Sequence, residues 1–167
     1  MIRAGATATV IAAGLTLTSC GGAAPARLPL SRWLRWDAAA RMATLILIPG
    51  YGSAYNGFNF NGYGKGQVLV TIPWRSTLVV RCQNSTSTSA HSCAIVSGPG
   101  VQRPVSKSAA TPAVPPGKSA SFTFHATAPA MYRIVSLVPN EELAGMWEVL
   151  TVAGSGRPSV TLLRSAA

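Results

Sequence analysis

Apolar and polar residues alternate along eight short stretches of this chain, and turn-forming residues separate those stretches. Each stretch predicts a β-strand, because residues two apart along a strand lie on the same face. The predicted strands are 43–48, 67–72, 77–84, 91–97, 119–125, 131–137, 146–153 and 159–163. The only helical pattern is RWLRWDAAARM, at residues 32–42. This spacing predicts an all-β fold, an antiparallel β-sandwich or barrel, over an alternating α/β arrangement.

Two long connections interrupt the strands. Residues 49–66 are rich in Gly, Asn and Tyr, and residues 98–118 are rich in Pro. Neither has the alternation of a strand. We interpret residues 98–118 as a surface excursion, and the sequence leaves open whether it is ordered or mobile.

The N-terminus has the features of an export signal. Arg3 precedes an uncharged, largely apolar run at residues 4–17, which is too short and too rich in small residues to span a membrane. The sequence LTSC, followed by two glycines, resembles the cleavage box of bacterial lipoproteins. The resemblance implies a signal peptide at residues 1–19 and lipidation of Cys20. An ordinary signal peptide cut nearby is the alternative.

The chain after the signal divides into a tether and one domain. Residues 20–35 are rich in Gly, Ala and Pro without any period, which predicts a lipid-anchored linker. Residues 36–167 are long enough for one domain with a core. We therefore expect an exported lipoprotein of the cell envelope, on the outer face of the cytoplasmic membrane or in the periplasm.

The charge of the chain indicates its class of partner. Lys and Arg number 14 against 4 Asp and Glu, which gives a formal net charge of +10. Such a charge favours anionic lipid or an acidic envelope or redox protein as partner. Nucleic acid is disfavoured, because the basic residues are scattered singly and no aromatic-basic recognition motif is present.

Two cysteines remain once Cys20 is assigned to lipid. Cys82 and Cys93 flank the polar run QNSTSTSAHS, and each belongs to the apolar, inward-facing set of its predicted strand. In an exported protein such a pair oxidises to a disulfide. A pair of free, metal-binding thiols is the alternative.

Two segments carry a resemblance to a known family. They are GFNFNGYGKGQVLVTIPWRSTLVVRCQNSTSTSAHSCAIV, at residues 57–96, and GMWEVLTV, at residues 145–152. Together they resemble the sulfocyanin family of blue-copper proteins, which are cupredoxins. The likeness covers about residues 44–153. It implies a cupredoxin-like Greek-key β-sandwich of seven to eight strands, with a metal at one end.

The resemblance also implies which positions would hold copper. Members of that family bind one copper through His, Cys, His and Met, a set that suits both copper oxidation states. His91 matches the first ligand and Met146 the last. The closing loop of the family reads Cys, two residues, Pro, one residue, His, three residues and Gly-Met. On this pattern Ser136 stands at the Cys position and Glu141 at the second His position.

These substitutions leave two hypotheses for function. Without a Cys at position 136 the chain cannot form a copper–thiolate centre, which favours a metal-free binding or structural module on the membrane. Alternatively, His91, Met146 and Glu141 bind copper in an altered site, with Cys93 or His125 recruited, for copper handling or electron transfer.

Enzymatic activity is not supported by the sequence. It contains no arrangement of Ser, His and Asp that indicates a catalytic triad, and no Gly-rich phosphate-binding loop. Glu141 and Glu142 are adjacent, so in an extended loop they would point apart, and we expect both to be solvated loop charges.

Overall fold

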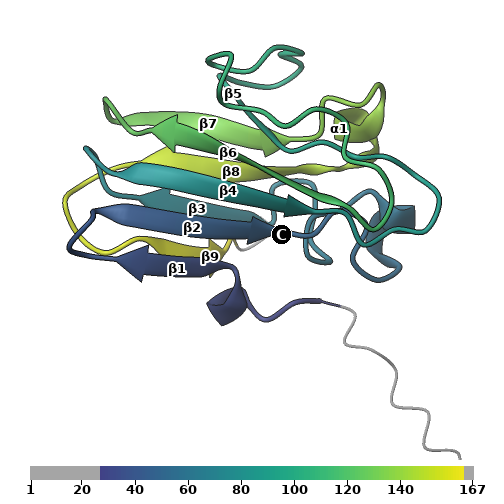
Figure 1. The fold of residues 1–167 in the computed structure, drawn as a ribbon, viewed down its shortest axis with the longest axis horizontal. Helices are drawn as coiled ribbons and strands as arrows, with labels where there is room; N and C mark the ends of the chain where they lie inside the picture. The colour runs from purple at the N-terminus through teal and green to yellow at the C-terminus, as the bar shows by residue number, and fades with distance from the viewer. Residues whose placement is uncertain (1–26, 164–167) are drawn as a thin grey trace, which may run out of the picture.

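Two β-sheets packed face to face make up the protein in the computed structural model, which describes residues 27–163 (Figure 1). The first sheet has the order β1 (Leu34–Asp37), β2 (Met42–Leu47), β4 (Thr77–Gln83) and β6 (Ser119–His125). The second has the order β5 (Ala94–Val96), β7 (Ala130–Val135), β8 (Trp147–Val152), β3 (Val68–Ile72) and β9 (Ser159–Leu162). The predicted all-β sandwich is confirmed, with two parallel pairs, β2 with β4 and β3 with β8, among antiparallel ones.

The helix suggested by residues 32–42 is wrong. A short 3₁₀ helix, η1 (Leu30–Arg32), is followed by the strand β1, which pairs antiparallel with β2. The exposure of β1 alternates, with Leu34 and Trp36 packed against the core. This two-residue period and the edge of β2 outweigh the helix propensity of the alanines, which form a turn instead.

The folded domain therefore begins earlier than the predicted boundary at residue 36. Trp33 is fully buried in the core, and Leu28 is buried beside it. Residues 28–35 belong to the domain, because these apolar side chains are removed from water. The predicted signal peptide at residues 1–19 and Cys20 lie outside the described residues.

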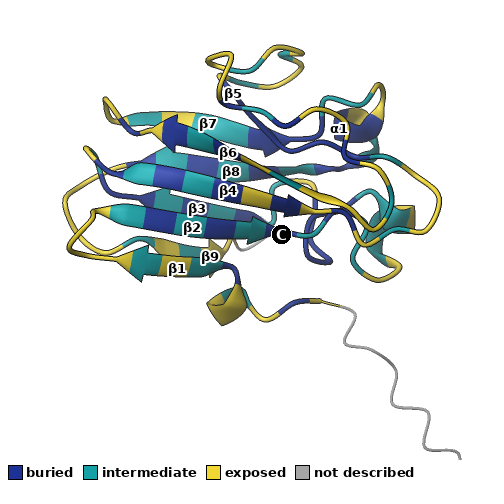
Figure 2. Cartoon of the chain, in the orientation of Figure 1, coloured by how far each residue is buried: buried dark blue, intermediate teal, exposed yellow. Residues whose placement is uncertain are grey.

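Alternation places the core between the sheets (Figure 2). In β2, β3, β4 and β8 every second side chain is buried, as Leu45, Val70, Val80 and Leu150 illustrate. The segment 49–66 closes one end of this core with Phe60.

Two asparagines of the FNFNG sequence hold that segment in place. Asn61 accepts the N–H of Ile48 (2.5 Å) and donates to the carbonyl of Ile46 (2.9 Å). Asn59 accepts the N–H of Gly62 (2.7 Å). Both side chains are fully buried, so these bonds satisfy polar groups that water does not reach.

A disulfide joins the two sheets. Cys82 lies near the end of β4 in the first sheet, and Cys93 directly precedes β5 in the second. Their Cα atoms are 5.9 Å apart and both side chains are fully buried. The predicted disulfide is confirmed, and it leaves neither thiol free to bind a metal.

The excursion at residues 98–118 is fastened to the second sheet. Ala110 forms a bridge with Ala94 of β5, and Val114 forms one with His91. The N–H of Cys93 donates to Thr111 Oγ1 (3.1 Å). The excursion is thus an ordered cover over the segment that carries His91. No helix in the described residues is long and apolar enough to cross a membrane.

Replacing both Cys82 and Cys93 by Ala should lower the free energy of unfolding by roughly 2–3 kcal/mol, because the bridge restricts the unfolded chain. Urea unfolding of the oxidised protein and the variant measures this difference. Dithiothreitol should destabilise the wild type and leave the variant unchanged. Equal sensitivity of the two proteins would contradict a stabilising disulfide.

Candidate metal centre

The four positions implied by the family resemblance gather at one end of the sandwich. His91 lies between the ends of β4 and the start of β5. Ser136 directly follows β7, Glu141 begins the short helix α1 (Glu141–Ala144), and Met146 directly precedes β8. Figure 1 shows α1 at the right-hand end of the sheets, next to the connections that close that end.

The loop 136–146 contains one helical turn, α1, where an extended loop was expected. Asn140 has a left-handed backbone (φ 68°) and starts α1. Gly145 ends it with φ 122°, and its N–H donates to the carbonyls of Glu141 and Glu142. A glycine suits this positive φ, which side-chain-bearing residues adopt at a cost. The turn brings Glu141 inward instead of leaving it in solvent.

His91 and Glu141 form a buried pair. His91 Nδ1 lies 2.9 Å from Glu141 Oε1 and 3.0 Å from Oε2. The two residues are only 3% and 5% exposed. Glu141 is therefore not the solvated charge that the sequence indicated. The Glu141 carboxylate contacts Nδ1 of the His91 imidazole. That nitrogen already has a hydrogen-bond partner within the protein.

Ser136 is fully engaged in hydrogen bonds. Its Oγ accepts the N–H groups of Ser92 (3.2 Å) and Val138 (3.3 Å), and it lies 3.3 Å from Ser92 Oγ. Ser92 Oγ in turn accepts the N–H of Leu137 (2.7 Å). The hydroxyl thus fastens the loop after β7 to the residue that follows His91.

Met146 is tied to the same group through its backbone. Its N–H donates to the carbonyl of Glu141 (2.9 Å), and its carbonyl accepts the N–H of Ser136 (3.2 Å). The side chain is fully buried in the main core cluster. The structure therefore brings all four predicted positions together, with Ser136, Glu141 and Met146 linked directly.

Neither of the two replacement ligands considered from the sequence, Cys93 and His125, is available to this site. Cys93 is in the disulfide. His125 ends β6 and lies beside Thr77, the first residue of β4, whereas His91 follows the end of β4. Within residues 27–163, no group of three or more His, Cys, Asp or Glu side chains could hold a metal ion. One paired imidazole, one engaged hydroxyl and one thioether do not fit a blue-copper centre.

Glu142, also predicted to be solvated, is buried and paired. Its Oε1 lies 3.0 Å from Arg133 Nη1 and accepts the N–H of Gly100 (3.2 Å). Oε2 accepts from Gln102 Nε2 (3.2 Å). The guanidinium of Arg133 lies 3.7 Å from the ring centre of Trp147. Glu142 thereby joins α1 to the excursion 98–118. These bonds fix the loop 136–146 to that excursion.

Glu148 is a third buried carboxyl group, which the sequence analysis missed. It is fully buried on the core side of β8, and its Oε2 accepts the N–H of Val68 (2.7 Å). Burial raises its pKa from 4.5 to about 8, and the Val68 hydrogen bond opposes that shift. The sequence could have predicted this burial, because Glu148 lies two and four residues before Leu150 and Val152, which face inward on the same side of the strand.

Known proteins resemble this chain in structure. No protein-family model and no curated protein sequence matches it. The reduced auracyanin of the photosynthetic bacterium Roseiflexus castenholzii is 26% identical, with a TM-score of 0.54, covering 66% of this chain and 96% of that one. Auracyanin A of Chloroflexus aurantiacus, a "blue" copper protein, is 18% identical with a TM-score of 0.52, covering 67% and 99%. Rusticyanin of Thiobacillus ferrooxidans is 21% identical with a TM-score of 0.50, covering 72% and 88%.

These similarities show that the chain has the blue-copper, or cupredoxin, fold. The disulfide between Cys82 and Cys93, together with this fold, indicates an extracytoplasmic location, since such bridges persist in oxidising compartments.

The His91–Glu141 pair should give non-additive stability effects. His91→Ala leaves a buried unpaired carboxylate and should destabilise by about 3–5 kcal/mol. Glu141→Ala leaves the imidazole unsatisfied and should lower the free energy of unfolding by about 1–3 kcal/mol. The double variant should lose clearly less than the sum of the two, as urea unfolding of all four proteins would show.

His125→Ala is the matched control for that cycle. Its Nδ1 contacts only Thr77 Oγ1, at 3.3 Å in an exposed position, so its effect should stay within about 0.5 kcal/mol. Additivity of the His91 and Glu141 variants would show that the two side chains do not depend on each other.

Glu148 should make stability fall as pH rises. The unfolded carboxyl group ionises near pH 4.5, whereas the folded one stays protonated up to about pH 8. The folded state therefore holds the extra proton between these values. The free energy of unfolding should decrease there by up to about 1.4 kcal/mol per pH unit. Urea unfolding across this range should show a shallower slope for Glu148→Gln, and identical slopes would refute this role.

Proposed function

We propose that the protein is an exported, sulfocyanin-like cupredoxin domain that works as a metal-free binding or structural module. The observation that carries this proposal is the contact of His91 Nδ1 with both carboxylate oxygens of Glu141. A buried carboxylate at the second-His position offers the imidazole a hydrogen-bond partner in place of a metal. Ser136, at the Cys position, supports the proposal because a hydroxyl is a poor ligand for Cu(I).

The proposed setting is the membrane surface of the cell envelope. Cys20 would carry the lipid, and the residues before the folded domain would tether it. The net charge of +10 supports anionic lipid or an acidic envelope protein as the partner. Enzymatic activity is not part of this proposal.

Copper titration of the full chain, purified in detergent, tests the proposal. Neither Cu(I) nor Cu(II) should bind tightly, and the weak binding that remains should be the same in His91→Ala. Isothermal titration and absorption spectra provide the measurement. Tight binding with one copper per chain, lost in His91→Ala, would instead support the alternative, an altered His/Met site for copper handling or electron transfer.

A restored site supplies the positive control. The double variant Ser136→Cys, Glu141→His returns the two missing ligand types. The N–H groups of Ser92 and Val138 already point at Ser136 Oγ and would stabilise a thiolate there. The variant should bind copper and gain the intense visible absorption of a copper–thiolate bond. If it stays colourless while remaining folded, the substitutions at these positions are not what prevents copper binding.

A further inference from the structure

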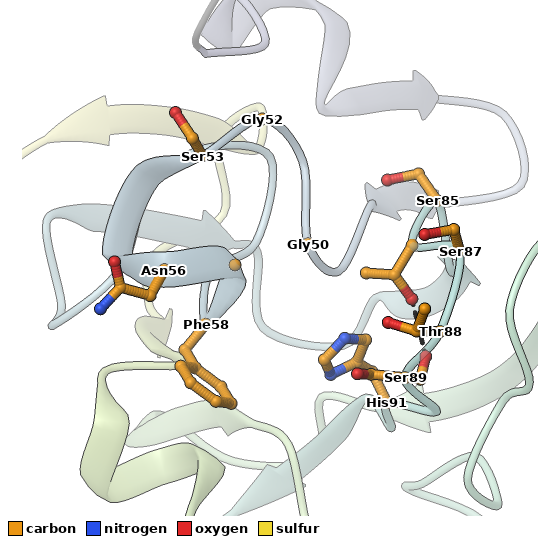
Figure 3. A pocket seen from close by; sticks show the side chains of 12 residues that line it. Gly50, Gly52, Ser53, Asn56, Phe58, Ser85, Ser87, Thr88, Ser89 and His91 are labelled. Atoms are coloured by element: carbon orange, nitrogen blue, oxygen red, sulfur yellow. Dashed lines mark hydrogen bonds between the residues drawn. The ribbon is translucent and has the colours of Figure 1, made fainter.

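A polar pocket lies beside His91, at the same end of the sandwich. It has a volume of about 530 Å³ and opens between two connections, residues 50–58 and residues 85–89. Figure 3 shows Ser53, Asn56 and Phe58 on one side, the hydroxyl side chains of residues 85–89 on the other, and the ring of His91 projecting into the space between them. A cavity of this volume suits a small ligand.

Hydrogen bonds from the side chain of Asn84 fix the wall formed by residues 85–89. The side chain of this buried residue donates to the carbonyls of Ser89 and Val114, both at 2.8 Å. Its Oδ1 accepts from the N–H (3.0 Å) and the hydroxyl (2.7 Å) of Thr86. This run is therefore fixed in shape before any ligand arrives, which reduces the ordering cost of binding.

The opposite wall approaches closely because it is built with glycine and left-handed residues. Gly50 has φ 69°, and a Cβ atom there would collide with the side chain of Thr86. Tyr55 and Asn56 both have φ 53°, a conformation that is costly for residues with side chains. This backbone turns Asn56 to the pocket rim. Strain retained at a cavity wall is typical of binding sites.

Several polar groups in the pocket have no partner in the described part of the chain. They are the hydroxyls of Ser53, Ser87, Thr88 and Ser89, the amide of Asn56 and Nε2 of His91. Because Nδ1 of His91 contacts Glu141, Nε2 is the ring nitrogen left to meet a ligand. The pocket offers both donors and acceptors, and no Lys, Arg, Asp or Glu is among its lining residues.

We propose that this pocket binds an uncharged sugar. A sugar presents many hydroxyl groups, each a donor and an acceptor, which match the hydroxyls, the amide of Asn56 and Nε2 of His91. Its apolar C–H face would pack on the ring of Phe58, which is half-buried and lines the pocket. The absence of charged lining residues selects against phosphorylated or acidic sugars, because their charges would lose water without gaining a partner.

This proposal rests on the metal-free function, since the ring of His91 is open to a sugar only while it contacts Glu141 and holds no metal. It gives the binding module a class of ligand, namely the neutral glycans of the envelope or its surroundings. The open mouth would let one sugar unit of a longer chain enter while the rest projects outward.

Titration of the full chain in detergent, with EDTA present, tests the proposal. The probes are galactose, mannose, N-acetylglucosamine and the disaccharides maltose, cellobiose and chitobiose, with glucuronic acid and glucosamine as charged counterparts. At least one neutral sugar should bind saturably and shift the amide NMR signals of residues 50–58 and 85–91. Charged counterparts should bind roughly tenfold more weakly.

Two variants locate the binding. Phe58→Ala removes the ring, and Asn56→Gly removes the amide while keeping a residue that adopts a positive φ. Each should weaken binding by roughly tenfold. Tyr51→Ala is the matched control, because Tyr51 is a half-buried aromatic residue of the same connection that lines a different cavity. It should leave binding unchanged.

The outcomes separate this proposal from the one on which it rests. No saturable binding by any neutral sugar, or equal losses in the three variants, overturns the sugar site and leaves the copper result untouched. Preferential binding of a charged sugar also overturns it. Tight copper binding at His91 in the separate titration overturns the metal-free function, even if the sugar binds in EDTA.

Discussion

A buried imidazole and a buried carboxylate satisfy each other at the end of this sandwich, and the local structure is arranged around that requirement. Neither His91 nor Glu141 has appreciable contact with water, so each depends on the other for a polar partner. The pair forms only if the segment before β5 meets the start of α1. The Ser92–Ser136 contacts hold the segment before β5 against the chain that leads to α1, and the cystine fixes the same segment to β4.

The same end of the molecule collects nearly all of the acid in the chain. Of four acidic residues, three are buried, namely Glu141, Glu142 and Glu148. Only Asp37 is exposed. The surface is therefore even more strongly basic than the net charge suggests, since the carboxylates that offset the arginines are inside. Such a surface attracts anionic surfaces, which supports the proposed contact with the envelope.

The sequence predicted most of the sheet structure because burial imposes a two-residue period. All eight predicted strands are present, and the phase of Cys82 and Cys93 identified the disulfide. Prediction from the sequence failed for residues whose structure depends on partners far away in the chain. The strand β1 requires the edge of β2, and the burial of Glu141 and Glu142 requires His91 and Arg133, which local charge patterns do not reveal. The ligand positions themselves came from the family resemblance.

The bond between Cys82 and Cys93 has a consequence for survival outside the cell. Residues 85–89 are the kind of polar, surface-exposed run that proteases cut first. Both cut ends would remain attached through the cystine, and Asn84 would still hold part of the severed run by its side chain. A single cleavage there would leave the two sheets covalently joined, so the domain tolerates a cut within residues 85–89.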